Sequence, residues 1–283
     1  MRVVFFGSSR YVIPIVEMLY NNFDLPLVVT TEQGSMDPIP FYCKAKKIEY
    51  ISIRKSADLL SSYPVSQAMG SVGVVADFGL ILPKQTLDTF PLGVLNIHPS
   101  LLPLYRGPSP VQNTILNGER ETGVTVIKLD KNVDHGPVLG QIKEEVKTND
   151  TSQTLYERLF KESAELLSKV LISYENSQAN LVPQKHEDAT FTKMLTREDG
   201  FIDFTNFFTG KDFFERIIRA YYPWPGVWTR VNLTEKKDDL KLLKFLPNKM
   251  VQVEGGREMQ YKDFINGYPK ANETLIGFLK KDI

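Results

Sequence analysis

The chain opens with Met1-Arg-Val-Val-Phe-Phe-Gly-Ser-Ser9, a short apolar run that leads directly into small turn residues. The β-branched and aromatic residues at 2–6 predict a buried strand, and Gly7 to Ser9 predict a tight turn. A helix is expected next, over residues 13–19. A strand, a tight turn and a helix in this order form the first half of a parallel βαβ unit.

Working outward, apolar runs of strand length recur and alternate with helical stretches. They lie at 27–31, 50–53, 71–75 and 93–98. This alternation predicts an α/β fold with a doubly wound, mainly parallel sheet. Two further strand-like runs, 123–129 and 138–146, are joined by a short connection. They predict an antiparallel hairpin at one side of the sheet.

The second half of the chain begins with a clear helix over residues 151–174, which Thr151 or Ser152 can cap. A polar segment without continuous apolar periodicity follows it. We therefore expect a catalytic domain over 1–185, a linker over 186–206 and a small, truncated, barrel-like β-rich domain over 207–283.

Composition limits the function classes. The 283 residues hold 34 Lys+Arg and 34 Asp+Glu, so net charge gives no argument for nucleic-acid binding, although local basic patches stay open. The single cysteine, Cys43, excludes an internal disulfide and a cysteine-based zinc site, and we expect it to be a buried apolar residue. No apolar segment approaches the roughly 18 residues of a membrane span. The chain start lacks a signal-peptide pattern, so we expect a cytoplasmic protein.

The densest cluster of chemically useful residues is Asn96-Ile97-His98-Pro99. Side chains alternate along a strand, so Asn96 and His98 project from one face, and Pro99 ends the strand. A neutral histidine can accept a proton near pH 7. An asparagine can donate an N–H to a developing oxyanion. Together they suit acyl transfer to an amine.

A third partner would orient the histidine. Asp134 lies in the connection between the two hairpin strands and could hold His98, as a carboxylate does in other histidine-based sites. The neighbouring His135 is either a rival base or an exposed turn residue. Because the three histidines, at 98, 135 and 186, are scattered, no metal site is predicted.

A resemblance supports this chemistry. Asn-x-His-Pro-Ser-Leu-Leu-Pro-x-Tyr-Arg-Gly at 96–107, followed by Glu-Thr-Gly-Val-Thr at 121–125 and Val-Asp-x-Gly at 133–136, resembles the folate-dependent formyltransferase family. The resemblance includes residues 6–9 and 78–83. It covers most of residues 1–230 and fades beyond them.

The resemblance implies a catalytic set of Asn96, His98 and Asp134 and no metal. It implies 10-formyltetrahydrofolate as the one-carbon donor. The donor-binding residues that it implies are Ser100, Leu101, Leu102, Pro103, Phe78, Gly79, Leu80, Val133 and Gly136. For the leucines, core packing is the alternative to ligand contact.

The stretch 189–203 and the segments 218–220 and 223–226 resemble family members that formylate the amino group of initiator methionyl-tRNA for translation initiation. Initiator methionyl-tRNA is therefore the implied partner, without DNA or a membrane, and the chain is expected to act as a monomer. Tyr11 and Arg106 are the implied acceptor contacts. Alternatively, Tyr11 packs on the sheet and Arg106 is a surface arginine.

Two differences from the family members that act on methionyl-tRNA leave the identity of the acceptor undecided. The loop at 30–38 holds two acids and no Lys or Arg, so it cannot displace counterions from phosphate. The C-terminal region is also shorter than the β-barrel of the family. An amino-sugar nucleotide is thus an alternative acceptor, and hydrolysis of the folate donor is a second alternative. A folate- or tRNA-binding module without catalysis is a third, which Asn96, His98 and Asp134 disfavour.

Overall fold

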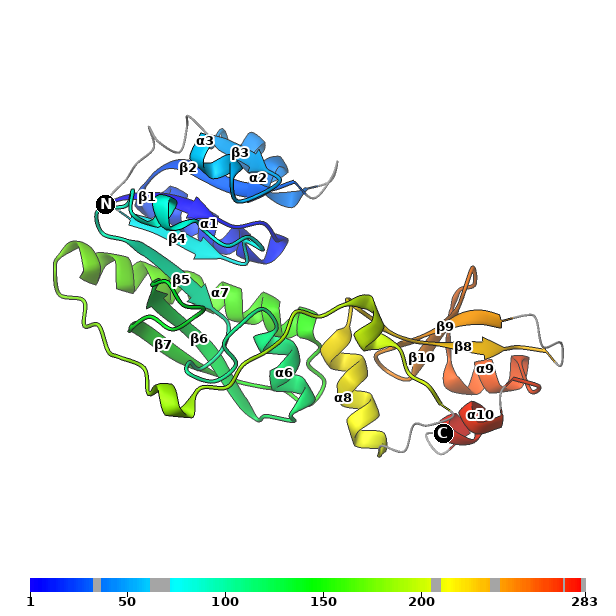
Figure 1. The fold of residues 1–283 in the computed structure, drawn as a ribbon. Helices are drawn as coiled ribbons and strands as arrows, with labels where there is room; N and C mark the ends of the chain where they lie inside the picture. Colours follow the sequence, from blue (N-terminus) through cyan, green and yellow to red (C-terminus); the bar gives the residue numbers. More distant parts are fainter. Residues whose placement is uncertain (33–36, 62–71, 205–209, 235–239, 272, 281–283) are drawn as a thin grey trace. The chain divides into compact units, whose positions relative to one another are not determined.

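The computed structural model describes residues 1–32, 37–61, 72–204, 210–234, 240–271 and 273–280 (Figure 1). The chain forms two compact units, and neither is continuous in sequence. The first unit contains 1–110, 121–145 and 156–192, and the second contains 111–120, 146–155 and 193–283. The proposed linker, 186–206, therefore crosses the boundary between residues 192 and 193.

The first unit is built on a seven-stranded sheet with the order β3-β2-β1-β4-β5-β6-β7. Its strands are β1 (Arg2–Phe6), β2 (Asp24–Thr31), β3 (Tyr50–Ile53), β4 (Val72–Ala76), β5 (Val94–His98), β6 (Glu121–Lys128) and β7 (Val138–Glu145). Strands β1 to β5 pair in parallel, whereas β6 and β7 are antiparallel at one edge. This topology confirms the predicted fold and the edge hairpin. Residue 71 of the predicted 71–75 strand lies outside the described residues.

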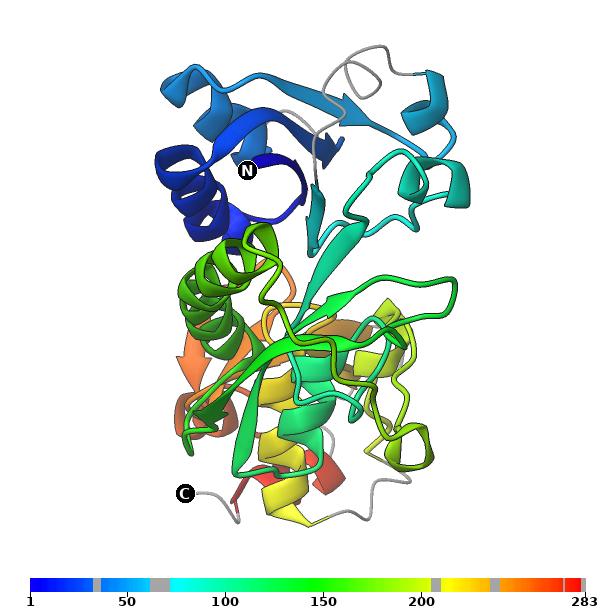
Figure 2. The same cartoon turned by 90° about the vertical axis from the view of Figure 1, so that its left-hand side faces the viewer.

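Helices cover both faces of this sheet, with α1 and α7 on one face and α5 on the other (Figures 1 and 2). The α-helices that begin before the second sheet are α1 (Ile13–Asn22), α2 (Pro38–Lys46), α3 (Asp58–Ser61), α5 (Lys84–Leu87), α6 (Pro110–Leu116) and α7 (Ser152–Glu175). The 3₁₀ turns are Arg10–Val12, His186–Asp188 and Arg197–Gly200. The hydroxyl of Thr151 accepts from the Thr154 N–H at 3.2 Å and caps α7, as expected. Among the described helices, none is long and apolar enough to cross a bilayer.

The core of the first unit makes its central strands a rigid platform. Residues 3–6 of β1 are fully buried, because parallel strands with helices on both faces have no solvent side. The ring of Phe6 meets those of Phe78 and Phe90 edge-on, with centroid distances of 5.6 and 6.0 Å. Edge-on aromatic pairs stabilise a core beyond their buried area. This core fixes the neighbouring strands β4 and β5, and β5 carries the first residues of the candidate site.

The second unit contains a four-stranded antiparallel sheet with the order β11-β10-β9-β8. Its elements are α8 (Lys211–Tyr221), β8 (Val227–Asn232), β9 (Leu240–Leu246), β10 (Met250–Val253), β11 (Glu258–Gln260), α9 (Tyr261–Gly267) and α10 (Glu273–Lys280). Phe214 of α8 lies at the centre of an aromatic core, 5.2 Å from the ring of Phe245 and 5.0 Å from that of Phe278. The β-rich character of this region was predicted. The two helices that follow the sheet, α9 and α10, were not predicted.

Cys43 of α2 is fully buried, as expected from the sequence, and burial raises the pKa of its thiol to about 11. The thiolate is the reactive form, so the folded protein should hold almost none of it at pH 8. We expect no reaction of the native protein with a thiol reagent over an hour at pH 8, and complete reaction of one thiol in guanidinium chloride. Native labelling at the rate of a free cysteine would contradict this placement.

Candidate active site

Strand β5 places Asn96 and His98 on the same face of the sheet. It ends at His98, directly before Pro99, as predicted. The side chain of His98 is 4% exposed, and its Cα is paired across the ladder with that of Thr125 in β6. A histidine buried to this extent is held in one orientation by its surroundings, so its two ring nitrogens have distinct partners.

The loop between β6 and β7 returns over this face and brings Asp134 to both residues. Its Oδ1 accepts from Asn96 Nδ2 at 3.1 Å, and its Oδ2 lies 3.5 Å from His98 Nδ1. The backbone N–H of Gly107 also donates to Oδ2, at 2.8 Å. Asp134 adopts a left-handed φ of 47°, which non-glycine residues adopt at a cost of about 1 kcal/mol. The structure therefore brings together the three residues that the sequence singled out.

The partner of the other imidazole nitrogen assigns the tautomer of His98. Nε2 lies 2.9 Å from the carbonyl oxygen of Tyr105. Because a carbonyl can only accept, Nε2 carries the proton, and Nδ1 is left as the nitrogen that exchanges one. Nδ1 is the nitrogen beside the Asp134 carboxylate. A carboxylate in this position can stabilise an imidazolium that forms during a proton transfer.

The loop after β5 is held by its own hydrogen bonds. The Ser100 hydroxyl donates to Leu104 O at 2.6 Å, and the Thr125 hydroxyl donates to Ser100 O at 2.6 Å. Gln141 Nε2 donates to Leu102 O at 3.1 Å. These bonds fix the backbone that presents Tyr105 O to His98 and the Gly107 N–H to Asp134.

The predicted folate contacts divide by accessibility. Gly79 and Val133 are exposed, and Leu80, Leu101 and Pro103 are half-buried. The others, Phe78, Ser100, Leu102 and Gly136, are buried within the protein. At Gly79, with a φ of 77°, an added Cβ would meet no atom within 4 Å, so open space lies beside its backbone. The accessible subset is the part that can touch a ligand in this conformation.

The two predicted acceptor contacts have different surroundings. Tyr11 is half-buried, and its ring stacks on that of Tyr156 at a centroid distance of 5.5 Å. Burial raises the pKa of Tyr11, so its phenol is neutral at physiological pH. Arg106 is only 3% exposed, and its Nη2 donates to Gln184 Oε1 at 2.6 Å and to His186 Nδ1 at 2.9 Å.

His135, the alternative base, is paired elsewhere. Its Nδ1 lies 2.6 Å from Asp130 Oδ2, and its ring stacks on that of His186 with a centroid distance of 3.9 Å. These contacts leave His98 as the imidazole that lies beside Asp134 and Asn96.

Sequence reasoning missed three groups of the site: the Tyr105 carbonyl, the Gly107 N–H and Gln184. The first two are main-chain groups, which carry no side-chain pattern. Gln184 lies two residues before the predicted linker, 186–206, in a polar segment. The sequence offered no signal, because a polar residue in a segment without apolar periodicity is typical of a surface loop.

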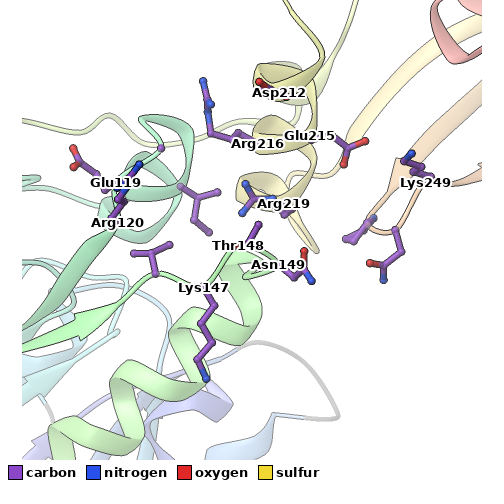
Figure 3. A pocket seen from close by; sticks show the side chains of 15 residues that line it. Glu119, Arg120, Lys147, Thr148, Asn149, Asp212, Glu215, Arg216, Arg219 and Lys249 are labelled. Atoms are coloured by element: carbon purple, nitrogen blue, oxygen red, sulfur yellow. The ribbon is translucent and has the colours of Figure 1, made fainter. Parts of the chain in front are cut away.

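A separate cavity of about 620 Å³ lies within the second unit, between α8, the segments 118–120 and 146–149, and the β9–β10 turn at 247–249 (Figure 3). Its cationic lining residues are Arg120, Lys147, Arg216, Arg219 and Lys249, and its acidic ones are Glu119, Asp212 and Glu215. The Leu116 carbonyl accepts from Arg216 Nε at 3.1 Å, and the Asp150 carbonyl accepts from Arg219 Nη1 at 2.9 Å. The two guanidinium groups are thereby oriented, and the cationic excess suits an anionic group.

Comparisons with known proteins identify the family of the chain. The formyl transferase family matches residues 33–171. The methionyl-tRNA formyltransferase of Chloroflexus aggregans is 38% identical over 238 residues, which cover 81% of this chain and 76% of that protein. The methionyl-tRNA formyltransferase of Methylacidiphilum infernorum is 32% identical over 318 aligned positions, covering 98% of each chain. That alignment is longer than this chain, which therefore lacks segments that the relative contains.

Solved structures share the fold. A 4-N formyltransferase from Francisella tularensis superimposes with a TM-score of 0.68 at 16% identity, covering 87% of this chain and 98% of that one. Glycinamide ribonucleotide transformylase 1 from Symbiobacterium toebii gives a TM-score of 0.56 at 18% identity, covering 64% of this chain and 92% of that one. These identities show the fold alone. The sequence relatives establish that the chain belongs to the formyl transferase family, among the proteins named methionyl-tRNA formyltransferases.

Proposed function

We propose that this protein transfers the formyl group of 10-formyltetrahydrofolate to the amino group of initiator methionyl-tRNA. The observation that carries the proposal is that Asn96 and His98 of strand β5 meet Asp134 of the β6–β7 loop. The names of the sequence relatives supply the acceptor. Translation initiation would place the protein in the cytoplasm, and we expect it to act as a monomer.

In the proposed mechanism, His98 and Asn96 stabilise the two charges that develop during the reaction. As the substrate amine attacks the formyl carbon, Nδ1 of His98 accepts the amine proton, while Nε2–H stays bonded to Tyr105 O. Collapse of the tetrahedral intermediate then breaks the bond between the formyl carbon and the folate N10, and Nδ1–H returns the proton to that departing nitrogen, which leaves tetrahydrofolate and the formylated amine. The Asn96 amide has two N–H groups, and one donates to Asp134. The other is suited to the oxyanion on the formyl oxygen. Asp134 stays ionised and keeps both groups oriented.

The accessible folate contacts favour a flat, partly apolar donor. Val133 and Ile81 are 61% and 82% exposed, in the two loops that the family resemblance assigns to the pterin. The open backbone at Gly79 leaves room for a ring edge to meet main-chain donors and acceptors. We propose that Gly79, Leu80, Leu101, Pro103 and Val133 contact the donor. The buried residues of the predicted set would then support the backbone of the donor site without contacting the donor.

For the acceptor, we propose that Tyr11 contacts the methionyl group, because a thioether packs favourably against an aromatic ring. The cationic cavity of the second unit, with Arg216, Arg219 and Lys249, is our candidate for a phosphate contact (Figure 3). Residues 33–36 of the acidic 30–38 loop lie outside the described residues.

The choice of acceptor is tested by competition. Purified protein with labelled 10-formyltetrahydrofolate would receive charged initiator tRNA or an amino-sugar nucleotide. Transfer to the tRNA, weakened steeply by salt because phosphate contacts release counterions, is the expected result. Transfer only to the sugar would replace the proposed acceptor, and the loss of the donor's formyl group without an acceptor would indicate hydrolysis.

Asn96→Ala removes one proposed oxyanion donor, which typically costs about 100- to 1,000-fold in turnover. We expect a kcat reduced to that extent in steady-state transfer assays, with the KM for the donor little changed. Thr122→Ala, at a buried polar residue of the sheet, is the control for the loss of a polar group. Turnover of Asn96→Ala near the wild-type value would rule out its assigned role.

A further inference from the structure

The turn that carries Asp134 is fastened along its length by a second segment of the chain. Gln184 Nε2 donates to the carbonyl of Asp134 at 2.9 Å and to that of Gly136 at 2.7 Å. Between these two carbonyls, the ring of His135 stacks on the ring of His186 with an interplanar angle of 4°. Residues 184–186, which we call the clamp, therefore contact each of residues 134–136.

Gln184 uses all of its hydrogen-bonding capacity in this position. The side chain is buried at 8% exposure, and its amide N–H groups go to the two turn carbonyls. Its Oε1 accepts from Arg106 twice, from Nη2 at 2.6 Å and from Nε at 3.2 Å. A carboxamide has two donors and an oxygen with two lone pairs, so each is occupied. The bonds on both sides fix the orientation of the amide.

Arg106 connects the clamp to the loop that faces His98. Its guanidinium holds Gln184, and the backbone N–H of the next residue, Gly107, donates to the Asp134 carboxylate. The carbonyl of the preceding residue, Tyr105, accepts from His98. Three consecutive residues thus contact His98, the clamp and Asp134 in turn.

The position of Arg106 is unusual for a purely structural arginine. Burying a cation is costly unless its hydrogen bonds are satisfied. In the described part of the chain, the side-chain hydrogen bonds of its guanidinium run to the carboxamide of Gln184 and the imidazole of His186. Because arginine can only donate, His186 Nδ1 must be the acceptor in its contact. The cation thus orders two neutral side chains that both touch the Asp134 turn.

We propose that Gln184 and Arg106 are positioning residues that hold the Asp134 carboxylate in register with Asn96 and His98. They act on the reaction through Asp134. This inference rests on the proposed formyl transfer. The clamp also supports the left-handed backbone of Asp134, a conformation that the surrounding contacts must stabilise.

Gln184→Glu removes the two N–H donors of the side chain and keeps its acceptor oxygen. The new side chain has the same shape and still accepts from Arg106, but an ionised carboxylate cannot donate to the two turn carbonyls. Misplacing a reacting group by about 1 Å can cost about 100-fold, so we expect kcat to fall by about that factor. The KM values for donor and acceptor should stay within about threefold, since Gln184 is buried and lies outside the proposed substrate contacts.

The control is Gln252→Glu, which removes a similar bond from a glutamine Nε2 to a backbone carbonyl, Gly256 O at 3.1 Å, in the second unit. It should leave kcat unchanged. If Gln184→Glu does not fold, Arg106→Lys replaces it, because lysine keeps the charge but lacks the planar fork that reaches both partners. Assays well below the melting temperature of each variant distinguish unfolding of the protein from displacement of the Asp134 carboxylate. A kcat within threefold of wild type in the folded variant would overturn the inference.

A double-mutant cycle tests whether the clamp acts through Asp134. In an Asp134→Asn background, Gln184→Glu should cost less than about threefold further, because the carboxylate that it positions is already gone. Full additivity of the two losses would overturn the inference even if Gln184→Glu alone is slow. Failure of the wild-type protein to transfer formyl to any acceptor would instead overturn the proposed function, so the two failures are distinguishable.

Discussion

Asp134→Asn should lower turnover by about 10,000-fold, the loss typical when the aspartate beside a catalytic histidine becomes an amide. The structure gives the reason. Oδ1 accepts from Asn96 Nδ2 and Oδ2 accepts from Gly107 N, so both oxygens already act as acceptors. An amide offers only one oxygen, which forces its NH₂ group against one of these donors. It also removes the charge that stabilises the His98 imidazolium.

Single-turnover formyl transfer at saturating donor and acceptor would measure this loss. Asp24→Asn is the matched control, because its carboxylate makes an exposed ion pair with Arg2 at 3.5 Å and lies outside the site. We expect that control to transfer formyl at the wild-type rate. A rate for Asp134→Asn within tenfold of wild type would show that the carboxylate does not support the proton transfer.

His98→Ala should lower turnover by about 100- to 10,000-fold, the range that general acid–base catalysis contributes. The 4% exposure of the His98 side chain means that its removal leaves an enclosed gap beside Asp134 and Tyr105 O. Added imidazole can enter that gap and accept the amine proton in place of the side chain. We therefore expect a concentration-dependent partial recovery of transfer in roughly 10–100 mM imidazole.

Recovery by imidazole distinguishes a chemical role from a structural one, since a misfolded variant would not respond. Wild-type turnover in His98→Ala would contradict the assignment directly. A deep loss that imidazole does not relieve, in a variant with an unchanged melting temperature, would mean that His98 acts by a contact that only the tethered ring can make.

Much of the fold could be predicted because the signals are local and periodic. The buried strands at 2–6 and 93–98, the edge hairpin and the helix over 151–174 each follow from a run of side chains with a clear period. The helices α9 and α10 were not expected. With seven and eight residues, each spans only about two helical turns, which is too short for apolar residues to repeat clearly at helical spacing.

The candidate site also contains a part that the sequence predicted and a part that it did not. The spacing of Asn96 and His98 on one strand was visible from alternation alone, and Asp134 from its place in the hairpin connection. The contacts that hold them were not visible. Tyr105 O and Gly107 N are main-chain atoms, and Gln184 reaches the site only because its segment packs beside the 134–138 stretch, where Val182 and Val138 form a bridge. Such pairings between distant loops depend on tertiary structure, which no local pattern encodes.

The most direct test of the central claim is formyl transfer from 10-formyltetrahydrofolate to charged initiator methionyl-tRNA by the purified protein, followed as formylmethionine released from the tRNA. We predict transfer of one formyl group per tRNA by the wild-type protein, and its loss in the His98→Ala protein. Wild-type protein that binds the folate donor but forms no formylmethionine, with the tRNA shown to be charged and intact, would contradict the proposed function.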